Sequence, residues 1–243
     1  MADTDKPTSE NCDGICEGCP SSSTCDSSQK TASGKPTGLP PKAKIDVDHV
    51  ILVLSGKGGV GKSTVSVNLA FALASHGFKV GLLDLDIHGP NVPKMLGIED
   101  QKLMTMGNRI EPVHITGNLS VVSMAFLLPE TSTPVIWRGP MKMTAIGQFL
   151  SDVNWEELNY LVVDLPPGTG DEALSIVQLA PNVRGAVIVT TPQDVATMDA
   201  MKAAKFVEKL DIPVIGIVEN MSGLVCPHSV SYTHLTLPTK RIV

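Results

Sequence analysis

The sequence predicts an α/β fold in which a mostly parallel sheet carries helices on both faces. Short apolar runs rich in β-branched residues alternate with segments of helical periodicity over most of the 243-residue chain. The runs are continuously apolar, which is typical of strands buried on both faces. A glycine-rich stretch, "SGKGGVGKST" at residues 55–64, joins the first run to the first helix. In such a fold, ligands bind at the carboxyl ends of the strands.

Two segments precede the predicted domain. Residues 1–25 contain four of the five cysteines, and residues 26–48 have the Ser, Thr, Pro, Gly and Lys content of a flexible linker. The N-terminus is polar and acidic and lacks the apolar core of a signal peptide. No run in the sequence is long and apolar enough to span a bilayer. We therefore expect a cytoplasmic protein, in which clustered cysteines more often bind metal than form disulfides.

The domain itself is predicted to span residues 49–228. Its first strand, at 50–56, ends in glycine, and the helix that follows, at 62–77, ends in the glycine that a C-cap needs. The same alternation then repeats along the chain. Further strands are predicted at 79–86, 119–126, 160–168, 185–192 and 213–220, and further helices at 171–180 and 194–210.

The glycine-rich stretch fits the phosphate-binding pattern G-x-x-x-x-G-K-[ST] from Gly56 to Ser63. In this pattern the backbone N–H groups of the loop surround the phosphates. Lys62 is predicted to reach the β- and γ-phosphates, and the Ser63 hydroxyl to bind Mg²⁺. The predicted ATP-binding residues are Gly56, Lys57, Gly58, Gly59, Val60, Gly61, Lys62, Ser63 and Thr64.

Three aspartates lie towards the ends of predicted strands that come close to this loop in the expected sheet. Asp164 is placed to hold Mg²⁺ directly or through water, while Asp86, two residues after Asp84, is predicted to position or activate the attacking water. The backbone of residues 166–171 is predicted to sense the γ-phosphate. Each aspartate taken alone could equally be a helix cap or a turn residue.

Asn220 ends the last predicted strand, at the same edge of the sheet. Its amide can both donate and accept hydrogen bonds, so it is a candidate for reading the adenine base. A role as a turn residue before a nearby glycine is an equally good interpretation.

The stretch "GKGGVGKST", with its additional lysine, resembles the deviant Walker A motif of the SIMIBI-class P-loop ATPases. The resemblance implies that Lys57 crosses the interface of a homodimer to the nucleotide of the partner subunit. There it would act on the developing phosphoryl charge as an arginine finger does. Lys57, Lys62 and Asp86 are then the expected catalytic residues. The alternative is that Lys57 only lies on a surface loop.

Within that class, the chain resembles the Mrp-type iron–sulfur cluster carriers over residues 49–228. The similarity is carried by "LLDLDIHGPNVPKMLG", "WRGPM", "VVDLPPGTGDE", "VIVTTPQDVA" and "VENMSG". It implies an ATPase that binds [4Fe–4S] clusters and transfers them to apo-proteins.

The N-terminal cysteines Cys12, Cys16, Cys19 and Cys25 lie close enough in sequence to surround one metal centre. Four thiolates suit a [4Fe–4S] cluster or Zn²⁺, and the spacing alone does not choose between them. The resemblance favours the cluster, since the scaffold branch of the carriers has C-x₂-C-x₅-C, as residues 16–25 do. Cys12 departs from that branch because it lies closer to the next cysteine.

The fifth cysteine, Cys226, lies in "CPHS", where the carriers have C-P-x-C and share a labile cluster between two subunits. Ser229 stands at the second cysteine position, and a serine oxygen is a poor substitute for a thiolate. His228 is a weaker candidate ligand. Residues 229–243 have no resemblance to the carriers and look non-native. We therefore expect an ATPase domain that is incomplete at its C-terminal end; the alternative is a natural short variant with serine.

Two other functions fit parts of the sequence. A positioning ATPase of the MinD/ParA type acts on DNA or membrane and favours a basic surface, but this chain has a formal net charge of −6. We therefore expect neither nucleic acid nor a membrane as partner. A nitrogenase-like reductase places a cluster cysteine near "DLPPGTGD", and this chain has none there.

Overall fold

The computed structural model describes residues 42–86, 89–107, 109–127, 139–225 and 232–233. All five cysteines lie outside these residues, as do His228 and Ser229. The described residues form one compact unit within residues 41–243. Among the helices of this described part, none is long and apolar enough to cross a membrane.

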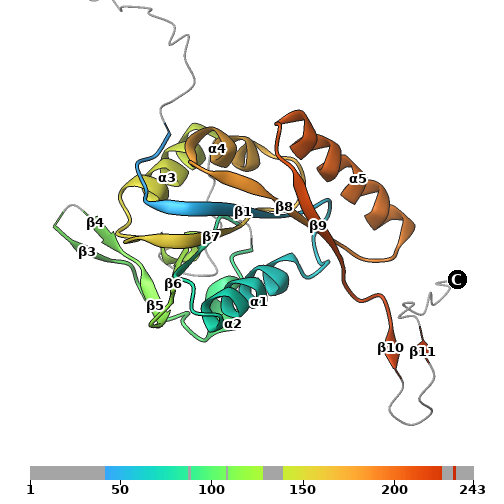
Figure 1. The fold of residues 1–243 in the computed structure, drawn as a ribbon, viewed down its shortest axis with the longest axis horizontal. Helices are drawn as coiled ribbons and strands as arrows, with labels where there is room; N and C mark the ends of the chain where they lie inside the picture. Colours follow the sequence, from blue (N-terminus) through green and yellow to red (C-terminus); the bar gives the residue numbers. More distant parts are fainter. Residues whose placement is uncertain (1–41, 87–88, 108, 128–138, 226–231, 234–243) are drawn as a thin grey trace, which may run out of the picture. The chain divides into compact units, whose positions relative to one another are not determined.

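A seven-stranded sheet organises this unit, as Figure 1 shows. The strand order is β5-β6-β2-β7-β1-β8-β9, and every neighbouring pair is parallel except β5 and β6. The strands are β1 (Val47–Ser55), β2 (Val80–Asp84), β5 (Val113–Thr116), β6 (Leu119–Ser123), β7 (Leu158–Asp164), β8 (Val183–Thr190) and β9 (Val214–Glu219). The predicted α/β fold with a mostly parallel sheet is confirmed.

Helices cover both faces of the sheet (Figure 1). The helices α1 (Lys62–Ser75) and α2 (Val92–Leu96) lie on one face, and α3 (Gly139–Ser151), α4 (Asp171–Leu179) and α5 (Asp194–Lys209) lie on the other. Two small antiparallel pairs complete the described elements: β3 (Met104–Met106) with β4 (Arg109–Glu111), and β10 (Leu224–Val225) with β11 (Tyr232–Thr233).

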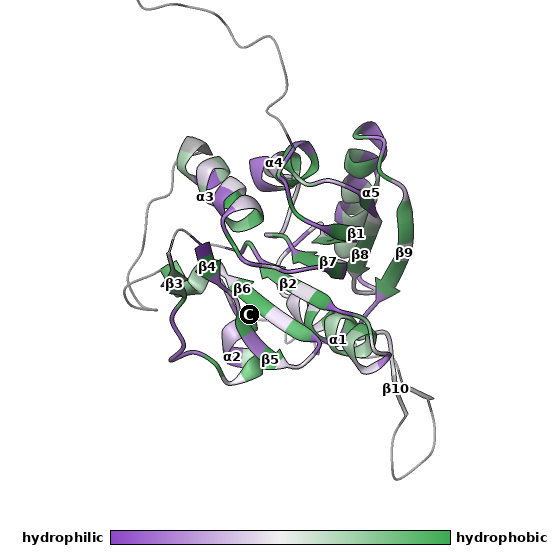
Figure 2. Ribbon diagram, turned by 60° about the vertical axis from the view of Figure 1, so that its left-hand side comes forward, coloured by the Kyte–Doolittle hydropathy of each residue, from purple (hydrophilic) through white to green (hydrophobic). Residues whose placement is uncertain are grey.

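Two large apolar cores follow from this layering, and a third, small cluster joins Ile188 of β8 to Ala200 and Ala203 of α5. Leu52 and Leu54 of β1 pack into one core together with Phe149 of α3, whereas Val53 packs into the other together with Val67 of α1. Successive side chains of a strand point to opposite faces, so a strand between two helix layers must be apolar at every position. Figure 2 shows this pattern along β1 and β8.

The strand ends differ from the sequence prediction by a few residues. The segments predicted as strands to residues 86 and 168 leave the sheet at Asp84 and Asp164, and a 3₁₀ turn, Met124–Leu127, ends the segment predicted to continue to 126. The residues beyond the ends of β2 and β7 belong to loops that lie beside the phosphate-binding stretch. The sequence analysis did not predict α3 or the short strands β3, β4 and β5.

Candidate nucleotide site

The glycine-rich loop lies between β1 and α1, at the carboxyl edge of the sheet. Gly59 and Gly61 have φ values of 79° and 86°, a backbone region that favours glycine. Gly61 is the N-cap of α1, whose first turn contains no acidic residue. The amino end of this helix therefore offers N–H groups and a positive dipole end to an anion.

Lys62 makes a buried ion pair with Asp164. The lysine Nζ lies 2.6 Å from Asp164 Oδ1, and the two side chains are 6% and 0% exposed. The Ser66 hydroxyl, one helical turn after Lys62, donates to the same carboxylate oxygen over 2.8 Å. The carboxyl end of β7 is thus held directly against the start of α1, as expected for a metal-binding aspartate beside a phosphate loop.

The second carboxylate oxygen of this aspartate has an unusual environment. Asp164 Oδ2 is buried and has no hydrogen-bond partner within the described part of the chain. A buried polar atom of this kind indicates a missing ligand such as a cation or water. Ser63 Oγ lies 3.4 Å from Lys62 Nζ, so a hydroxyl and a carboxylate oxygen flank the same lysine. Oxygen donors of this type fit Mg²⁺ when phosphate oxygens complete its coordination.

Asp84 ends β2 directly opposite Asp164, because the two residues are register partners in neighbouring strands. Its carboxylate accepts hydrogen bonds from the backbone N–H of Asp86, over 3.1 Å, and from the Ser123 hydroxyl, over 2.9 Å. Burial raises the pKa of Asp84 to about 7, and the negative charge of Asp164 adds to the rise. Two buried carboxyl groups therefore share one edge of the site, with Lys62 as a nearby cation.

Asp86 lies at the start of the loop after β2. Its backbone N–H is held by Asp84, and its own carboxylate accepts from the Gly89 N–H over 3.2 Å. The side chain is largely buried and lines the same cavity as Lys62. The structure thus brings together Asp86, Asp164 and Lys62, three residues that the sequence analysis had placed on three different segments.

Lys57 contacts the start of α5. Its Nζ donates to the side-chain oxygen of Gln193, the N-cap residue of α5, over 3.0 Å at an exposed position. The cavity formed by the rest of the loop does not include Lys57 among its lining residues. The two lysines of the loop therefore have separate surroundings.

Two further predicted site residues, Gly56 and Asn220, make close packing contacts around the glycine-rich loop. A Cβ added at Gly56 would collide with the backbone of Asp199 in α5, so glycine is required for this close approach. Asn220, after β9, donates from its side-chain amide to the Val60 carbonyl over 2.9 Å, and a Cβ at Gly61 would collide with that amide. Asn220 thus contacts the loop that was predicted to bind ATP, and a role in reading adenine remains a prediction.

These elements enclose a cavity of about 280 Å³. The glycine-rich stretch supplies seven of the twelve lining residues, and Pro167 of the predicted phosphate-sensing segment lies across from Gly58. The lining residues are Ser55, Gly58, Gly59, Gly61, Lys62, Ser63, Thr64, Asp86, Asn91, Met95, Pro167 and Met221. The size and polarity of this cavity suit the phosphate end of a nucleotide.

The sequence analysis missed several of these residues. Ser66 could have been found, because it follows Lys62 by four positions on a helix and so shares its face. Asn91, Met95 and Met221 come from short or irregular segments whose direction the hydrophobic pattern does not encode.

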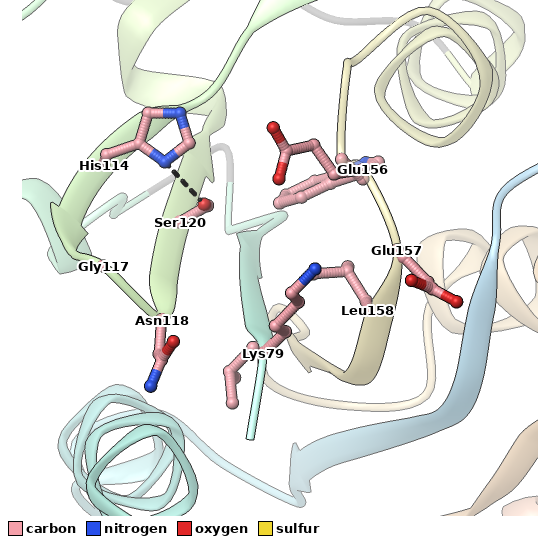
Figure 3. A pocket seen from close by; sticks show the side chains of 10 residues that line it. Lys79, His114, Gly117, Asn118, Ser120, Glu156, Glu157 and Leu158 are labelled. Atoms are coloured by element: carbon pink, nitrogen blue, oxygen red, sulfur yellow. Dashed lines mark hydrogen bonds between the residues drawn. The ribbon is translucent and has the colours of Figure 1, made fainter. Parts of the chain in front are cut away.

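A second, smaller cavity of about 50 Å³ lies at the amino edge of the sheet, where β2, β6 and β7 begin. Figure 3 shows His114 and Ser120 hydrogen-bonded at its rim, with Glu156, Glu157 and Lys79 around the opening. Within the described residues, no group of three or more His, Cys, Asp or Glu side chains could hold a metal ion.

Comparison with known proteins assigns the family. Residues 46–237 match a family described as the NUBPL iron-transfer P-loop NTPases, within the ParA group. An iron–sulfur cluster carrier protein of Methanocaldococcus jannaschii is 52% identical over 217 residues, which are 89% of this chain and 74% of the relative. The cytosolic Fe-S cluster assembly factor CFD1 of Saccharomyces cerevisiae is 48% identical and is covered over 70% of its length.

Solved structures agree with the family assignment. A nucleotide-binding protein from Archaeoglobus fulgidus in complex with ADP is 41% identical, has a TM-score of 0.66, and covers 78% of this chain and 73% of its own. The cell division ATPase MinD of Pyrococcus furiosus has a TM-score of 0.51 at 22% identity, with 75% of this chain and 78% of its own covered. At that identity the likeness to MinD extends to the fold alone.

Proposed function

The chain belongs to the family of NUBPL-type iron-transfer P-loop NTPases, and from this premise we propose that it is an ATP-dependent carrier of iron–sulfur clusters. The observation that supports the ATP-dependent part is that Lys62 and Asp86 line one phosphate-sized cavity while Asp164 contacts Lys62. The names of its relatives from M. jannaschii and S. cerevisiae support the cargo.

Nucleotide binding requires Lys62 to change partner. Its ammonium group contacts the Asp164 carboxylate, and the phosphates of ATP would compete for the same charge. The backbone N–H groups of the glycine-rich loop and the amino end of α1 would bind the phosphate oxygens. Binding would therefore release an Asp164 oxygen at the same time as it engages Lys62.

Ser63 and Asp164 fit a Mg²⁺ ion, because both are oxygen donors and one carboxylate oxygen is buried without a partner in the described chain. When bound, Mg²⁺ would neutralise charge that develops on the β- and γ-phosphate oxygens. Asp86 would accept a hydrogen bond from the attacking water and direct it at the γ-phosphate. Its orientation is set by the hydrogen bonds with Asp84 and Gly89.

We further propose that hydrolysis takes place in a homodimer. Lys57 lies outside its own cavity, so it is available to reach the nucleotide of a second copy and stabilise the developing charge there. Breaking the present contact of Lys57 costs little free energy, because an exposed hydrogen bond to Gln193 exchanges readily with water.

The cargo is proposed to be a [4Fe–4S] cluster, delivered to apo-proteins that require it. Cys12, Cys16, Cys19 and Cys25 would hold one cluster. A second cluster shared between subunits needs two thiolates from each subunit, so Cys226 with Ser229 in place of the second cysteine would not hold it stably. The cytosolic placement of CFD1 supports a cytosolic location for the present protein.

Anaerobic reconstitution with iron and sulfide tests the carrier function. We expect about four irons per N-terminal site, with cluster-type absorption, and transfer to an apo-enzyme that needs a [4Fe–4S] cluster. Cys19→Ala or Cys25→Ala should remove this cluster and leave ATP binding unchanged. Zinc in place of iron after native anaerobic purification, without cluster absorption, would contradict the cluster assignment.

A further inference from the structure

An ion pair links α3 to α4 on the face of the sheet away from α1. Lys142 Nζ of α3 lies 2.6 Å from Glu172 Oε1 of α4, and the two side chains are 17% and 9% exposed. Glu172 is in the first turn of α4, where the positive end of the helix dipole also favours its charge. Ion pairs shielded from water in this way are screened less by salt than surface pairs.

Glu172 also lies against the segment that leads into its helix. A Cβ added at Gly170, the N-cap residue of α4, would be 2.6 Å from Glu172 Oε2. One carboxylate oxygen therefore contacts Lys142 while the other lies beside Gly170. The Glu172 side chain therefore lies directly against the last residue of loop 165–170.

The other end of loop 165–170 is tied to the strand that precedes the phosphate loop. Leu165 N–H donates to the Val53 carbonyl over 3.2 Å, and Gly168 N–H donates to the Ser55 carbonyl over 2.8 Å. Between these anchors, Pro167 lines the nucleotide cavity, about 4.0 Å from where a Cβ on Gly58 would stand. The loop is thus held at both ends while its middle faces the cavity.

From this arrangement we infer that Lys142 and Glu172 are positioning residues for hydrolysis, which hold loop 165–170 where it meets the γ-phosphate. The pair sets how well the site distinguishes ATP from ADP. This inference rests on the proposed nucleotide-binding function and adds two residues from outside the cavity to it.

The expected difference between the affinities for ATP and ADP follows from which residues line the cavity. The glycine-rich loop and the amino end of α1 surround the phosphates that both nucleotides possess. Asp86 and Pro167 line the same cavity outside the loop, and the proposed role of Asp86 towards the attacking water would put the γ-phosphate, which only ATP has, on their side. A displaced loop 165–170 therefore weakens ATP binding and slows hydrolysis, whereas contacts to ADP are retained.

The test compares wild-type protein with Lys142→Ala and Glu172→Gln. Dissociation constants for Mg-ADP and for a non-hydrolysable Mg-ATP analogue are measured by calorimetry, and hydrolysis is measured separately. We expect both variants to bind Mg-ADP with an affinity near that of wild type and to bind the ATP analogue roughly tenfold more weakly. We expect kcat to fall by about ten- to a hundredfold, the size of effect that loss of a positioning contact has on hydrolysis. Lys142→Arg retains the cation and should restore the ATP preference.

Lys202→Ala is the matched control. It removes a lysine from an exposed ion pair with Asp199 on α5, and it should leave both affinities unchanged. If Lys142→Ala does not fold, Glu172→Gln carries the same prediction because it keeps the shape of the side chain. Equal weakening of both nucleotides, or no change in their ratio, overturns the inference. Wild-type protein that binds neither nucleotide contradicts the proposed function and the inference together.

Discussion

Lys62 has two competing partners: the Asp164 carboxylate 2.6 Å away, and the phosphate oxygens for which the surrounding loop is arranged. A buried lysine without a counter-charge would be unstable, so the contact with Asp164 stabilises the folded protein before nucleotide binds. The same contact keeps the ammonium group at the entrance of the loop. Asp164 therefore has a structural role as well as the proposed role towards Mg²⁺.

Lys62→Ala should lower ATP affinity by up to about a hundredfold, because a charge-assisted contact to phosphate is worth up to roughly 3 kcal/mol. It should also destabilise the fold by about 3 kcal/mol, since Asp164 loses its buried counter-charge. Calorimetry measures the first effect and urea unfolding the second. Lys57→Ala, in the same loop but exposed, should change neither quantity by much. Undiminished ATP affinity in Lys62→Ala would exclude the assignment.

Asp84→Asn should change how stability depends on pH. The pKa of Asp84 is raised from 3.8 to about 7 by burial and by the charge of Asp164, so the folded protein binds this proton more tightly than the unfolded chain does. Its contribution to stability is full below pH 3.8 and is lost as pH rises through about 7. Asparagine does not titrate, so the free energy of unfolding of the variant, relative to wild type, should increase over this window. Urea unfolding at several pH values measures it; a constant difference would contradict the prediction.

At the scale of elements, the phosphate loop depends on close packing against α5. Gly56→Ala places a methyl group against the backbone of Asp199, which cannot rotate away as a side chain can. We expect a loss of about 1 to 3 kcal/mol in the free energy of unfolding, as for other overpacked sites. Gly58→Ala is the matched control, because its nearest neighbour, Pro167 Cγ, would be 4.0 Å away. If urea unfolding gives the two variants the same free energy of unfolding, then α5 shifts to accommodate the methyl group and the prediction is wrong.

The sheet could be predicted from sequence because its strands are buried on both faces. Segments such as 50–54 and 161–163 are apolar at every position, and only a strand between two helix layers requires this. The helix α3 was missed because Gly139 and Pro140 stand at its start and Gly147 within it, and both residue types have low helix propensity. The strands β3 and β5 were missed because they are short and largely exposed.

The residue types that form the site could be predicted from the sequence, but the contacts between these residues could not. The motif placed Lys62 and Ser63, and the strand ends placed the aspartates at one edge of the sheet. The pairing of Asp84 with Asp164 depends on β2 and β7 being neighbours in register, which local patterns do not encode. The Lys142–Glu172 pair depends on the packing of α3, an element that was not predicted.

At the scale of the whole molecule, the proposed homodimer has two sites that each use residues from both copies. Lys57→Ala and Asp86→Ala homodimers should both fail to hydrolyse ATP. A mixture should recover about a quarter of wild-type activity, since half of the dimers are then heterodimers with one complete site each. Activity is measured after the two purified variants are mixed at increasing concentration. Recovery that does not exceed the sum of the separate variants would contradict action across the interface.

The strand order also determines at which stage of protein synthesis the nucleotide site can form. The first strand made, β1, lies between β7 and β8 in the sheet, and Lys62 must meet Asp164, 102 positions later in the chain. Until β7 emerges from the ribosome, β1 is an apolar strand with two unpaired edges, which is a hazard for aggregation. Such non-local pairing is slow to form. Slower synthesis at low temperature, or a chaperone that shields β1, should therefore raise the yield of folded protein more than any change at the nucleotide cavity.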